Sequence, residues 1–362
     1  MKIDGKTSHN SPFIRFPEFT GEWEYFSIND VCSEFKSGKN IKADLISSNG
    51  NFPVYGGNGL RGYTSSYNHD GLYVLIGRQG ALCGNVRSVF GKIYITEHAI
   101  AVAGNEKSDT YFLHYLFLKM NLGQYSDQSA QPGLAVNKLL KLKVLLPSIS
   151  EQIKIAKLLS LLDERIAVQS RLIEDLKKLS CAVSNKLFQS VKGVVIPLSG
   201  ISNIVKGKQI NGDFLADVGE YYVMNGGTEP SGYYDNYNVE ANTISISEGG
   251  NSCGYVQFNR MPFWSGGHCY TIQDIVSDVE TLYLYHYLKS KEESIMELRI
   301  GTGLPNIQKK DLAEFKVIIP AIEQQRTISN ILSLLERKTE VEGRMLIAMR
   351  TEKQYLIHQM FI

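Results

Sequence analysis

Residues 147–189 read PSISEQIKIAKLLSLLDERIAVQSRLIEDLKKLSCAVSNKLFQ, and a related stretch occupies residues 320–362. The two stretches align at a shift of 173 residues, which places Gln152 on Gln325 and SLLD at 160–163 on SLLE at 333–336. Self-similarity at one long spacing indicates that a complete structural unit has been duplicated. The fold of this chain is therefore expected to consist of two related halves.

Both stretches predict a long helix whose apolar residues recur in steps of four and three, the pattern of a coiled-coil seam. The seam positions are Ile155, Leu159, Leu162, Ile166, Ile173, Leu176, Val183 and Leu187 in the first copy, and Ile328, Leu332, Leu335, Thr339, Leu346, Met349, Leu356 and Met360 in the second. Each copy opens with a proline and contains no other, so each helix can extend over about 40 residues, or about 60 Å. We expect the helices to pair antiparallel about a pseudo-twofold axis. The alternative is two independent amphipathic helices, each packed on its own domain.

The segments between these helices also repeat, at a shift of 170 residues. This shift places residues 57–134 on 227–304 and pairs Cys83 with Cys253 and His98 with His268. The predicted order is a first domain at residues 1–146, a first helix at 147–190, a second, homologous domain at 191–319 and a second helix at 320–362.

Each domain is predicted to belong to the α+β class. Runs of β-branched and aromatic residues predict strands at residues 73–76, 85–90, 243–246 and 255–258. Helical spacing of apolar residues predicts helices at residues 111–120 and 280–289, the second with Asp278 as its N-cap. Glycine-rich loops separate these elements.

Composition and charge narrow the class of protein. A chain of 362 residues with 43% hydrophobic residues has room for two globular domains. No apolar run approaches the roughly 18 residues of a membrane span. The five cysteines include no Cys-x-x-Cys pair, which argues against a disulfide framework and favours the cytoplasm. The net charge is +1, but residues 191–319 carry 10 basic and 15 acidic side chains, which argues against nucleic-acid binding by that domain.

No catalytic or metal site is predicted. Residues 57–62 satisfy G-x-G-x-x-G, but the residues that follow do not read as a helix, so the pattern does not predict a dinucleotide site. Cys83 with His98, and Cys253 with His268, offer two metal ligands per domain where zinc needs three or four, so we expect buried or hydrogen-bonded side chains instead. The chain contains no Asn-Pro, so the Asn-Pro-Pro-aromatic loop of amino-methylating enzymes is absent.

Polar and aromatic residues gather beside the repeated glycines and differ between the two domains. Unlike side chains on like loops suit two readers of different DNA sequences, because Arg matches guanine, Asn and Gln match adenine, and Glu accepts from cytosine. The alternative is free drift of duplicated loops. The candidate DNA-binding residues are Lys39, Asn58, Arg61, Tyr63, Arg78, Gln79, Asn85 and Gln131 in the first domain, and Lys208, Asn225, Thr228, Glu229, Tyr233, Glu248, Asn251 and Thr302 in the second.

The chain resembles the specificity subunits of type I restriction-modification systems over essentially its whole length. The resemblance is carried by the aromatic segment at residues 12–23, the two proline-led helices, and the paired Gly-Leu loops at 133–134 and 303–304. It implies two target-recognition domains, each reading one half of a bipartite asymmetric site in double-stranded DNA. The helices would set the spacing between the half-sites and dock two methyltransferase subunits.

The same resemblance implies a non-catalytic chain that binds no cofactor and no membrane. S-adenosylmethionine, ATP and Mg would be bound by partner subunits, the restriction subunits of the full complex among them. The alternative that the residues leave open is a non-catalytic glycan-binding or adaptor protein, in which tyrosine-rich loops stack on sugars and the helices only dimerise.

Overall fold

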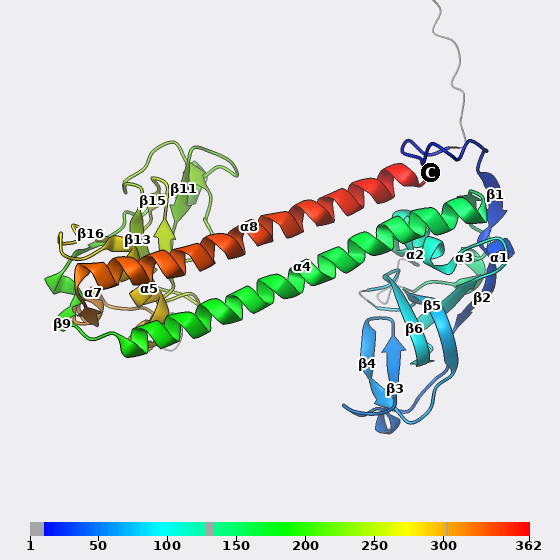
Figure 1. Cartoon of the computed structure of the whole chain (residues 1–362), viewed down its shortest axis with the longest axis horizontal. Coiled ribbons are helices and arrows are strands. Elements are labelled where there is room, and N and C mark those ends of the chain that lie inside the picture. Colours follow the sequence, from blue (N-terminus) through cyan, green and yellow to red (C-terminus); the bar gives the residue numbers. More distant parts are fainter. Residues whose placement is uncertain (1–10, 81, 128–132, 302, 304) are drawn as a thin grey trace, which may run out of the picture. The chain divides into compact units, whose positions relative to one another are not determined.

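A computed structural model describes residues 11–362 of the chain except 81, 128–132, 302 and 304. The chain divides into two compact units (Figure 1). Unit 1 combines Met1–Ser170 with Met345–Ile362, and unit 2 is Arg171–Arg344. Both long helices are shared between the units, so the units do not correspond to the four predicted segments one by one. The predicted bounds of those segments stay predictions.

Unit 1 contains a six-stranded sheet in the order β2-β7-β5-β6-β3-β4 and a two-stranded sheet of β1 and β8. Its strands are β1 Glu24–Ser27, β2 Cys32–Ser37, β3 Phe52–Gly56, β4 Gly59–Thr64, β5 His69–Gly77, β6 Val86–Ile95, β7 Ala99–Gly104 and β8 Lys143–Leu146. Its helices are α1 Ile28–Val31, α2 Thr110–Met120, α3 Val136–Leu139 and the first part of α4 Ile149–Ser190, with short 3₁₀ turns at Ala43–Leu45 and Leu122–Tyr125.

Unit 2 repeats this plan with shorter strands, in sheets ordered β10-β16-β13-β14, β12-β11-β15 and β17-β9. Its strands are β9 Val194–Pro197, β10 Asn203–Lys206, β11 Tyr221–Met224, β12 Tyr233–Tyr234, β13 Thr243–Ser247, β14 Val256–Asn259, β15 Trp264–Ser265, β16 Cys269–Gln273 and β17 Lys316–Ile319. Its helices are α5 Thr281–Ser290, α6 Glu292–Met296, α7 Lys309–Ala313 and the first part of α8 Ile322–Met360, with 3₁₀ turns at Leu198–Gly200 and Gly212–Phe214.

Pro262 accounts for the main difference between the two sheets. In unit 1, β6 is one long strand that pairs antiparallel with β5 and, near its end, parallel with β3. In unit 2 the equivalent strand is split into β14, which pairs with β13, and β15, which pairs with β11. Proline has no backbone N–H to donate to a neighbouring strand, so a strand breaks where it occurs. The α+β class and the four predicted strands are confirmed.

The helices packed on the two sheets are confirmed, but one predicted cap is wrong. α2 is capped by Asp109, whose side chain accepts from the N–H of Phe112 at 2.8 Å. In unit 2 the residue at the equivalent place is Glu280, whose side chain accepts from the N–H of Tyr283. Asp278, the predicted cap, lies two residues too early for its carboxylate to occupy the cap position.

The seam of the two long helices is confirmed. Every predicted seam position is buried or partly buried, while most of the flanking positions are exposed. In unit 1, Leu159 near the start of α4 shares a core with Met360 near the end of α8. In unit 2, Leu187 near the end of α4 packs on the core that contains Leu332 from the start of α8. The start of each helix therefore meets the end of the other, so α4 and α8 are antiparallel, and the alternative of two independent helices is wrong.

A buried glutamine fastens the start of each long helix to its own unit. Gln152 is fully buried; its Oε1 accepts from the N–H of Asp109 at 2.9 Å, and its Nε2 donates to the carbonyls of Lys107 and Pro147, both at 2.9 Å. Gln325 makes the same three bonds in unit 2. Buried polar groups are stable only when they are paired, so each glutamine locks the loop before α2 or α5 to the helix behind it. None of the described helices combines the length and the apolar character that crossing a membrane would need.

Candidate nucleic-acid interface

In unit 1 the turn between β3 and β4, the residues after β5 and the turn between β6 and β7 approach one another closely. A Cβ atom on Gly57, in the β3–β4 turn, would lie 2.7 Å from the carbonyl oxygen of His98, and one on Gly77 would lie 2.8 Å from the carbonyl oxygen of Gly57. The loops approach this closely because glycine has no side chain there. We call residues 57–61, 77–79 and 96–98 loop cluster 1.

Most of the candidate residues of the first domain come together at loop cluster 1. Asn58, Arg61 and Gln79 are exposed there. The Arg61 side chain runs along Gly56, whose added Cβ would lie 2.8 Å from Arg61 Cδ. Lys39 is exposed and joins the cluster through its N–H, which donates to the carbonyl of Ile95 at 3.0 Å. These side chains form a polar, partly cationic surface.

Two described candidates lie beside the cluster and not among its residues. Tyr63 is within β4, and its backbone exchanges two hydrogen bonds with Ser47, both at 2.9 Å. Asn85 is exposed and lies next to the cluster, where its carbonyl accepts from the N–H of Gly77 at 2.8 Å. Gln131 lies outside the described residues.

Arg87 lies against loop cluster 1, although no sequence pattern selected it. Its guanidinium lies over Gly59, where an added Cβ would be 2.7 Å from Nη1. Gly59 has a φ of 103°, a conformation that favours glycine, so the turn leaves room for the guanidinium. The contact joins β6 to β4. It depends on how the strands are arranged in the sheet, which no local sequence motif shows. Arg87 is an additional candidate for DNA contact.

The backbone of Arg78 is held at the centre of loop cluster 1 by hydrogen bonds with His98, Leu134 and Cys83. We call this set of bonds the backbone cradle. Its N–H donates to the carbonyl of His98 at 2.9 Å, and its own carbonyl accepts from the N–H of Leu134 at 2.9 Å and from Cys83 Sγ at 3.3 Å. Its side chain is partly buried, and Nε is buried with no hydrogen-bond partner among the described residues. An arginine held this way keeps guanidinium donors for an external acceptor.

Unit 2 builds the same cradle around a residue of opposite charge. The N–H of Glu248 donates to the carbonyl of His268 at 2.9 Å, and its carbonyl accepts from the N–H of Ile307 at 2.8 Å and from Cys253 Sγ at 3.0 Å. We call residues 225–229, 247–249 and 266–268 loop cluster 2. Because the backbone bonds match one for one, Arg78 and Glu248 are equivalent positions.

The carboxylate of Glu248 is neutralised within unit 2. Oε1 accepts from Lys206 Nζ at 2.6 Å and from Tyr270 Oη at 3.0 Å, and Oε2 lies 3.6 Å from His268 Nδ1. Burial raises the pKa of Tyr270, and the bond to Glu248 raises this pKa further. Both effects keep Tyr270 a neutral hydrogen-bond donor. Lys206 was not among the candidate residues.

The other candidates of the second domain are divided between loop cluster 2 and the neighbouring strands. Asn225 Oδ1 accepts from the N–H of His268 at 3.2 Å, and Lys208 repeats the bond of Lys39 by donating its N–H to the carbonyl of Ser265 at 2.9 Å. Tyr233 lies in β12 and is partly buried. Thr302 lies outside the described residues. The exposed candidates near the cluster are Thr228, Glu229 and Asn251.

The histidines and cysteines that pair in the duplication have separate roles. His98 Nδ1 donates to Gln79 Oε1 at 3.1 Å, so the expectation of a buried or hydrogen-bonded side chain is confirmed for it, through the hydrogen bond and not through burial, since the side chain is 46% exposed. The His268 side chain is 64% exposed. The two cysteines instead bond to the carbonyls of Arg78 and Glu248 and belong to the cradles.

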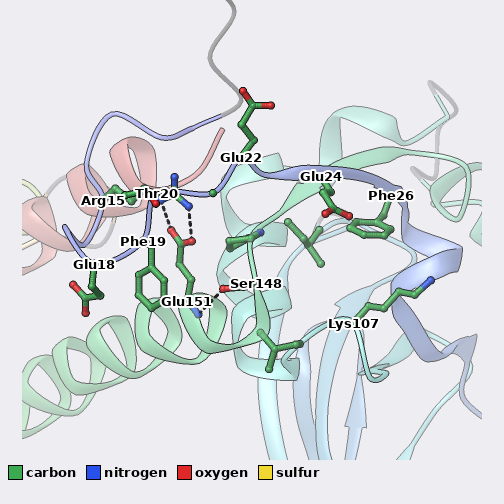
Figure 2. A pocket seen from close by; sticks show the side chains of 14 residues that line it. Arg15, Glu18, Phe19, Thr20, Glu22, Glu24, Phe26, Lys107, Ser148 and Glu151 are labelled. Atoms are coloured by element: carbon green, nitrogen blue, oxygen red, sulfur yellow. Dashed lines mark hydrogen bonds and ion pairs between the residues drawn. The ribbon is translucent and has the colours of Figure 1, made fainter.

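A pocket of about 510 Å³ lies in unit 1 beside the start of α4, away from loop cluster 1. Figure 2 shows Arg15 and Glu151 facing each other in it, joined by two hydrogen bonds of 2.7 Å. The bonds to Glu151 raise the pKa of Arg15. Glu18 forms an ion pair with Lys154 at its rim. Because these charges satisfy each other, we assign the pocket a structural role, which is to hold the N-terminal segment against α4.

The chain is similar in sequence to known DNA specificity proteins. The family model described as type I restriction modification DNA specificity domain matches residues 20–178 and 191–348. The specificity subunit of type I restriction enzyme EcoprrI from Escherichia coli is 50% identical over 112 residues, which cover 31% of this chain and 28% of that subunit. A Haemophilus influenzae protein described as a type I restriction enzyme specificity subunit is 24% identical over 362 residues, covering 92% of this chain and 93% of that protein.

A solved structure shares the fold. The crystal structure of the S subunit of a type I restriction-modification system from M. genitalium matches with a TM-score of 0.78 and 21% identity, covering 97% of this chain and 99% of that chain. The chain thus spans 28% of the EcoprrI relative's length and nearly the whole length of the H. influenzae relative and of the M. genitalium structure.

Proposed function

The chain belongs to the type I restriction-modification DNA specificity family, and from this premise we propose that it selects the DNA sequence on which a type I restriction-modification complex acts. Each unit would read one half of a bipartite asymmetric site in double-stranded DNA. The observation that carries the proposal is the pair of equivalent loop clusters with unlike side chains, Arg78 in one cradle and Glu248 in the other. Sequence is read by hydrogen bonds to base edges, so two sites that differ in donors and acceptors suit two different half-sites.

The second domain is acidic, but this is compatible with DNA binding because some of its carboxylates are paired with lysines. Glu248 is paired with Lys206, and Glu292 is paired with Lys289 at 2.6 Å. Paired carboxylates repel phosphate less than free ones. Dissolved salt screens the repulsion from the unpaired carboxylates beyond about 10 Å. The glycan-binding or adaptor alternative has no comparable support from the family match.

We propose that the chain is a non-catalytic subunit and that methylation and cleavage belong to its partners. S-adenosylmethionine would be bound by methyltransferase subunits, and ATP and Mg by restriction subunits. The proposal places this work in the cytoplasm, where the DNA of a bacterial or archaeal cell lies. Turnover of S-adenosylmethionine or ATP by the isolated chain would contradict the proposal that it is non-catalytic.

Two methyltransferase subunits are proposed to dock on the long helices. Outside the seam, α4 exposes an apolar stripe of Leu161, Val168 and Leu172, which are 49%, 69% and 39% exposed. At the shift of 173 residues, α8 exposes Leu334, Val341 and Met345 at 58%, 50% and 43%. Exposed apolar patches mark interaction surfaces. Because the two stripes are equivalent, they suit two copies of one partner.

The test is to express the chain with a methyltransferase encoded beside it and to map methylated bases in the host genome. We expect one bipartite asymmetric motif that is present with this gene and absent without it. A motif that persists when the gene is deleted would assign sequence selection to another protein. Methylation that is independent of sequence would do the same.

We expect replacement of Arg78 by methionine to weaken binding of the complex to its own site by about 1–3 kcal/mol and to relax one base position. A bidentate arginine–guanine contact has this value, whereas a phosphate contact weakens binding to all DNA equally. Binding is measured by titration of the complex with its mapped site and with a site changed at one base. Arg326, exposed on α8, is the control, and its replacement by methionine leaves both affinities unchanged. Equal losses on both DNAs would assign Arg78 to phosphate.

Replacing Val341 by glutamate is expected to prevent one methyltransferase copy from binding. A charge placed in an apolar interface loses its hydration without gaining a partner. Native mass spectrometry of the co-purified complex then gives one partner copy instead of two, and replacing Val168 as well gives none. Thr351→Glu adds the same charge on α8 outside the stripe and serves as control. Two bound copies in the Val341→Glu variant would exclude this stripe.

A further inference from the structure

The cradles of the two units hold opposite charges, yet each unit presents a cation at its cradle. We propose that Lys206, held in place by Glu248 and Tyr270, is the base-reading cation of unit 2, in the role that Arg78 has in unit 1. The inference rests on the proposed DNA function and deepens it. It assigns Lys206 as a specificity-determining residue and Glu248 as a positioning residue.

Glu248 itself is not placed to touch a base. Its side chain is 12% exposed, its Oε1 already accepts from Lys206 and Tyr270, and its Oε2 is buried. The Lys206 side chain is 51% exposed. The carboxylate therefore lies inside and the ammonium outside, so an approaching DNA edge meets Lys206 first.

Two positions beside the cradle also differ between the units, and they differ together with the residue inside it. In the sheet of unit 2, Lys206 is the register partner of Tyr270; in unit 1 the same pair of positions holds Ser37 and Ile100. A buried carboxylate needs a cation and a donor, which Lys206 and Tyr270 supply. An arginine in the cradle needs neither, and a lysine beside it would repel it. The serine and the isoleucine of unit 1 match that requirement.

The geometry favours a base contact over a phosphate contact for Lys206. A lysine side chain is flexible, and a phosphate can be bound by a mobile ammonium. Here one of the three N–H donors of Lys206 is fixed on a carboxylate that Tyr270 also holds, so the other two point in defined directions. Guanine offers two neighbouring acceptors, O6 and N7, in the major groove. We assign Lys206 to a guanine of the half-site read by unit 2.

The experiment uses the complex co-expressed with its methyltransferase and compares three variants. Lys206→Met with Glu248→Gln removes both charges at once, so no buried charge is left unpaired. We expect this double variant to bind the mapped site about 10- to 100-fold more weakly and to methylate sites that differ at one guanine. Glu248→Gln alone keeps the ammonium but frees it, and is expected to relax the same position with a smaller loss.

The third variant gives unit 2 the residue types that unit 1 has at the three equivalent positions, through Glu248→Arg, Lys206→Ser and Tyr270→Ile. It returns a cation to the cradle, so binding is expected to recover to within about 10-fold of the original. Lys208→Met is the control, since Lys208 is exposed near the same strand end but has no orienting carboxylate among the residues that the structure describes. It weakens binding to all DNA alike.

The outcomes separate this inference from the proposed function. A wild-type complex without a sequence motif overturns both. A wild-type motif that the double variant keeps at every position overturns only the assignment of Lys206. A double variant whose motif and affinity are the same as those of Glu248→Gln alone identifies Glu248 as the reader and overturns the assignment as well.

Discussion

Replacing Gln325 by alanine is expected to lower the free energy of unfolding of unit 2 by about 3–6 kcal/mol. The change leaves the N–H of Glu280 and the carbonyls of Asp278 and Pro320 without the partner that the fully buried Gln325 side chain supplies. Each buried polar group that loses its partner costs about 1–3 kcal/mol, and two of these three bonds are only partly buried, so their cost lies toward the lower end. For a unit of this size, the midpoint of thermal unfolding falls on the order of 10 °C.

Gln324 provides a matched control one residue earlier on the same helix. It is exposed, so Gln324→Ala is expected to change the midpoint by less than about 2 °C, in the range of surface substitutions. Circular dichroism during heating gives the midpoint, and hydrogen exchange at the first turn of α5 reports the local effect. A Gln325→Ala variant as stable as Gln324→Ala would show that the three bonds contribute nothing to stability.

Replacing Trp23 by alanine is expected to destabilise unit 1 by about 3–5 kcal/mol, the range for a buried large aromatic side chain. Trp23 is 1% exposed and packs edge-on against Phe112 at 6.1 Å and Phe361 at 6.4 Å. It thereby joins the N-terminal segment to the end of α8. The N–H of Ile14 also bonds to the carbonyl of Gln359 at 3.0 Å. Urea unfolding followed by far-ultraviolet circular dichroism measures the loss.

Two further variants test the cause of that loss. Trp23→Phe keeps most of the ring and removes an indole N–H that is buried with no partner among the described residues, so its effect should be the smaller one. Trp264→Ala removes the other tryptophan, which is only partly buried, and unit 1 should keep its stability. Equal losses from Trp23→Ala and Trp23→Phe would contradict a role in packing.

The elements predicted best were those whose signal is periodic and local. The seam from Leu159 to Leu187 was readable because a helix returns to the same face every three to four residues, whatever it packs against. The strands β5 and β13 were readable because each contains a local run of β-branched and aromatic residues. The N-cap of α5 was not, because Asp278 and Glu280 both offer a carboxylate and only the turn geometry selects between them.

The candidate site was predicted in part. The shared glycines located the loops that meet at loop cluster 1, since only glycine allows such close backbone approach. Arg87 and Lys206 were missed because each gains its place through strand register. Tyr63 was included because it follows a glycine, although its backbone pairing places it along β4 and outside the cluster. A local sequence motif does not show which strand will lie next to it in the sheet.

The sequence by itself determined that the chain is duplicated and that two long helices join its halves, because repetition and helical periodicity are properties of residue order. Only the tertiary structure decided which charge each half presents. Lys206 and Glu248 are 42 residues apart and meet because β10 and β13 both lie beside β16. Whether a buried carboxylate repels DNA or orients a lysine depends on that contact. Such contacts arise from packing between strands, which residue order specifies only through the complete fold.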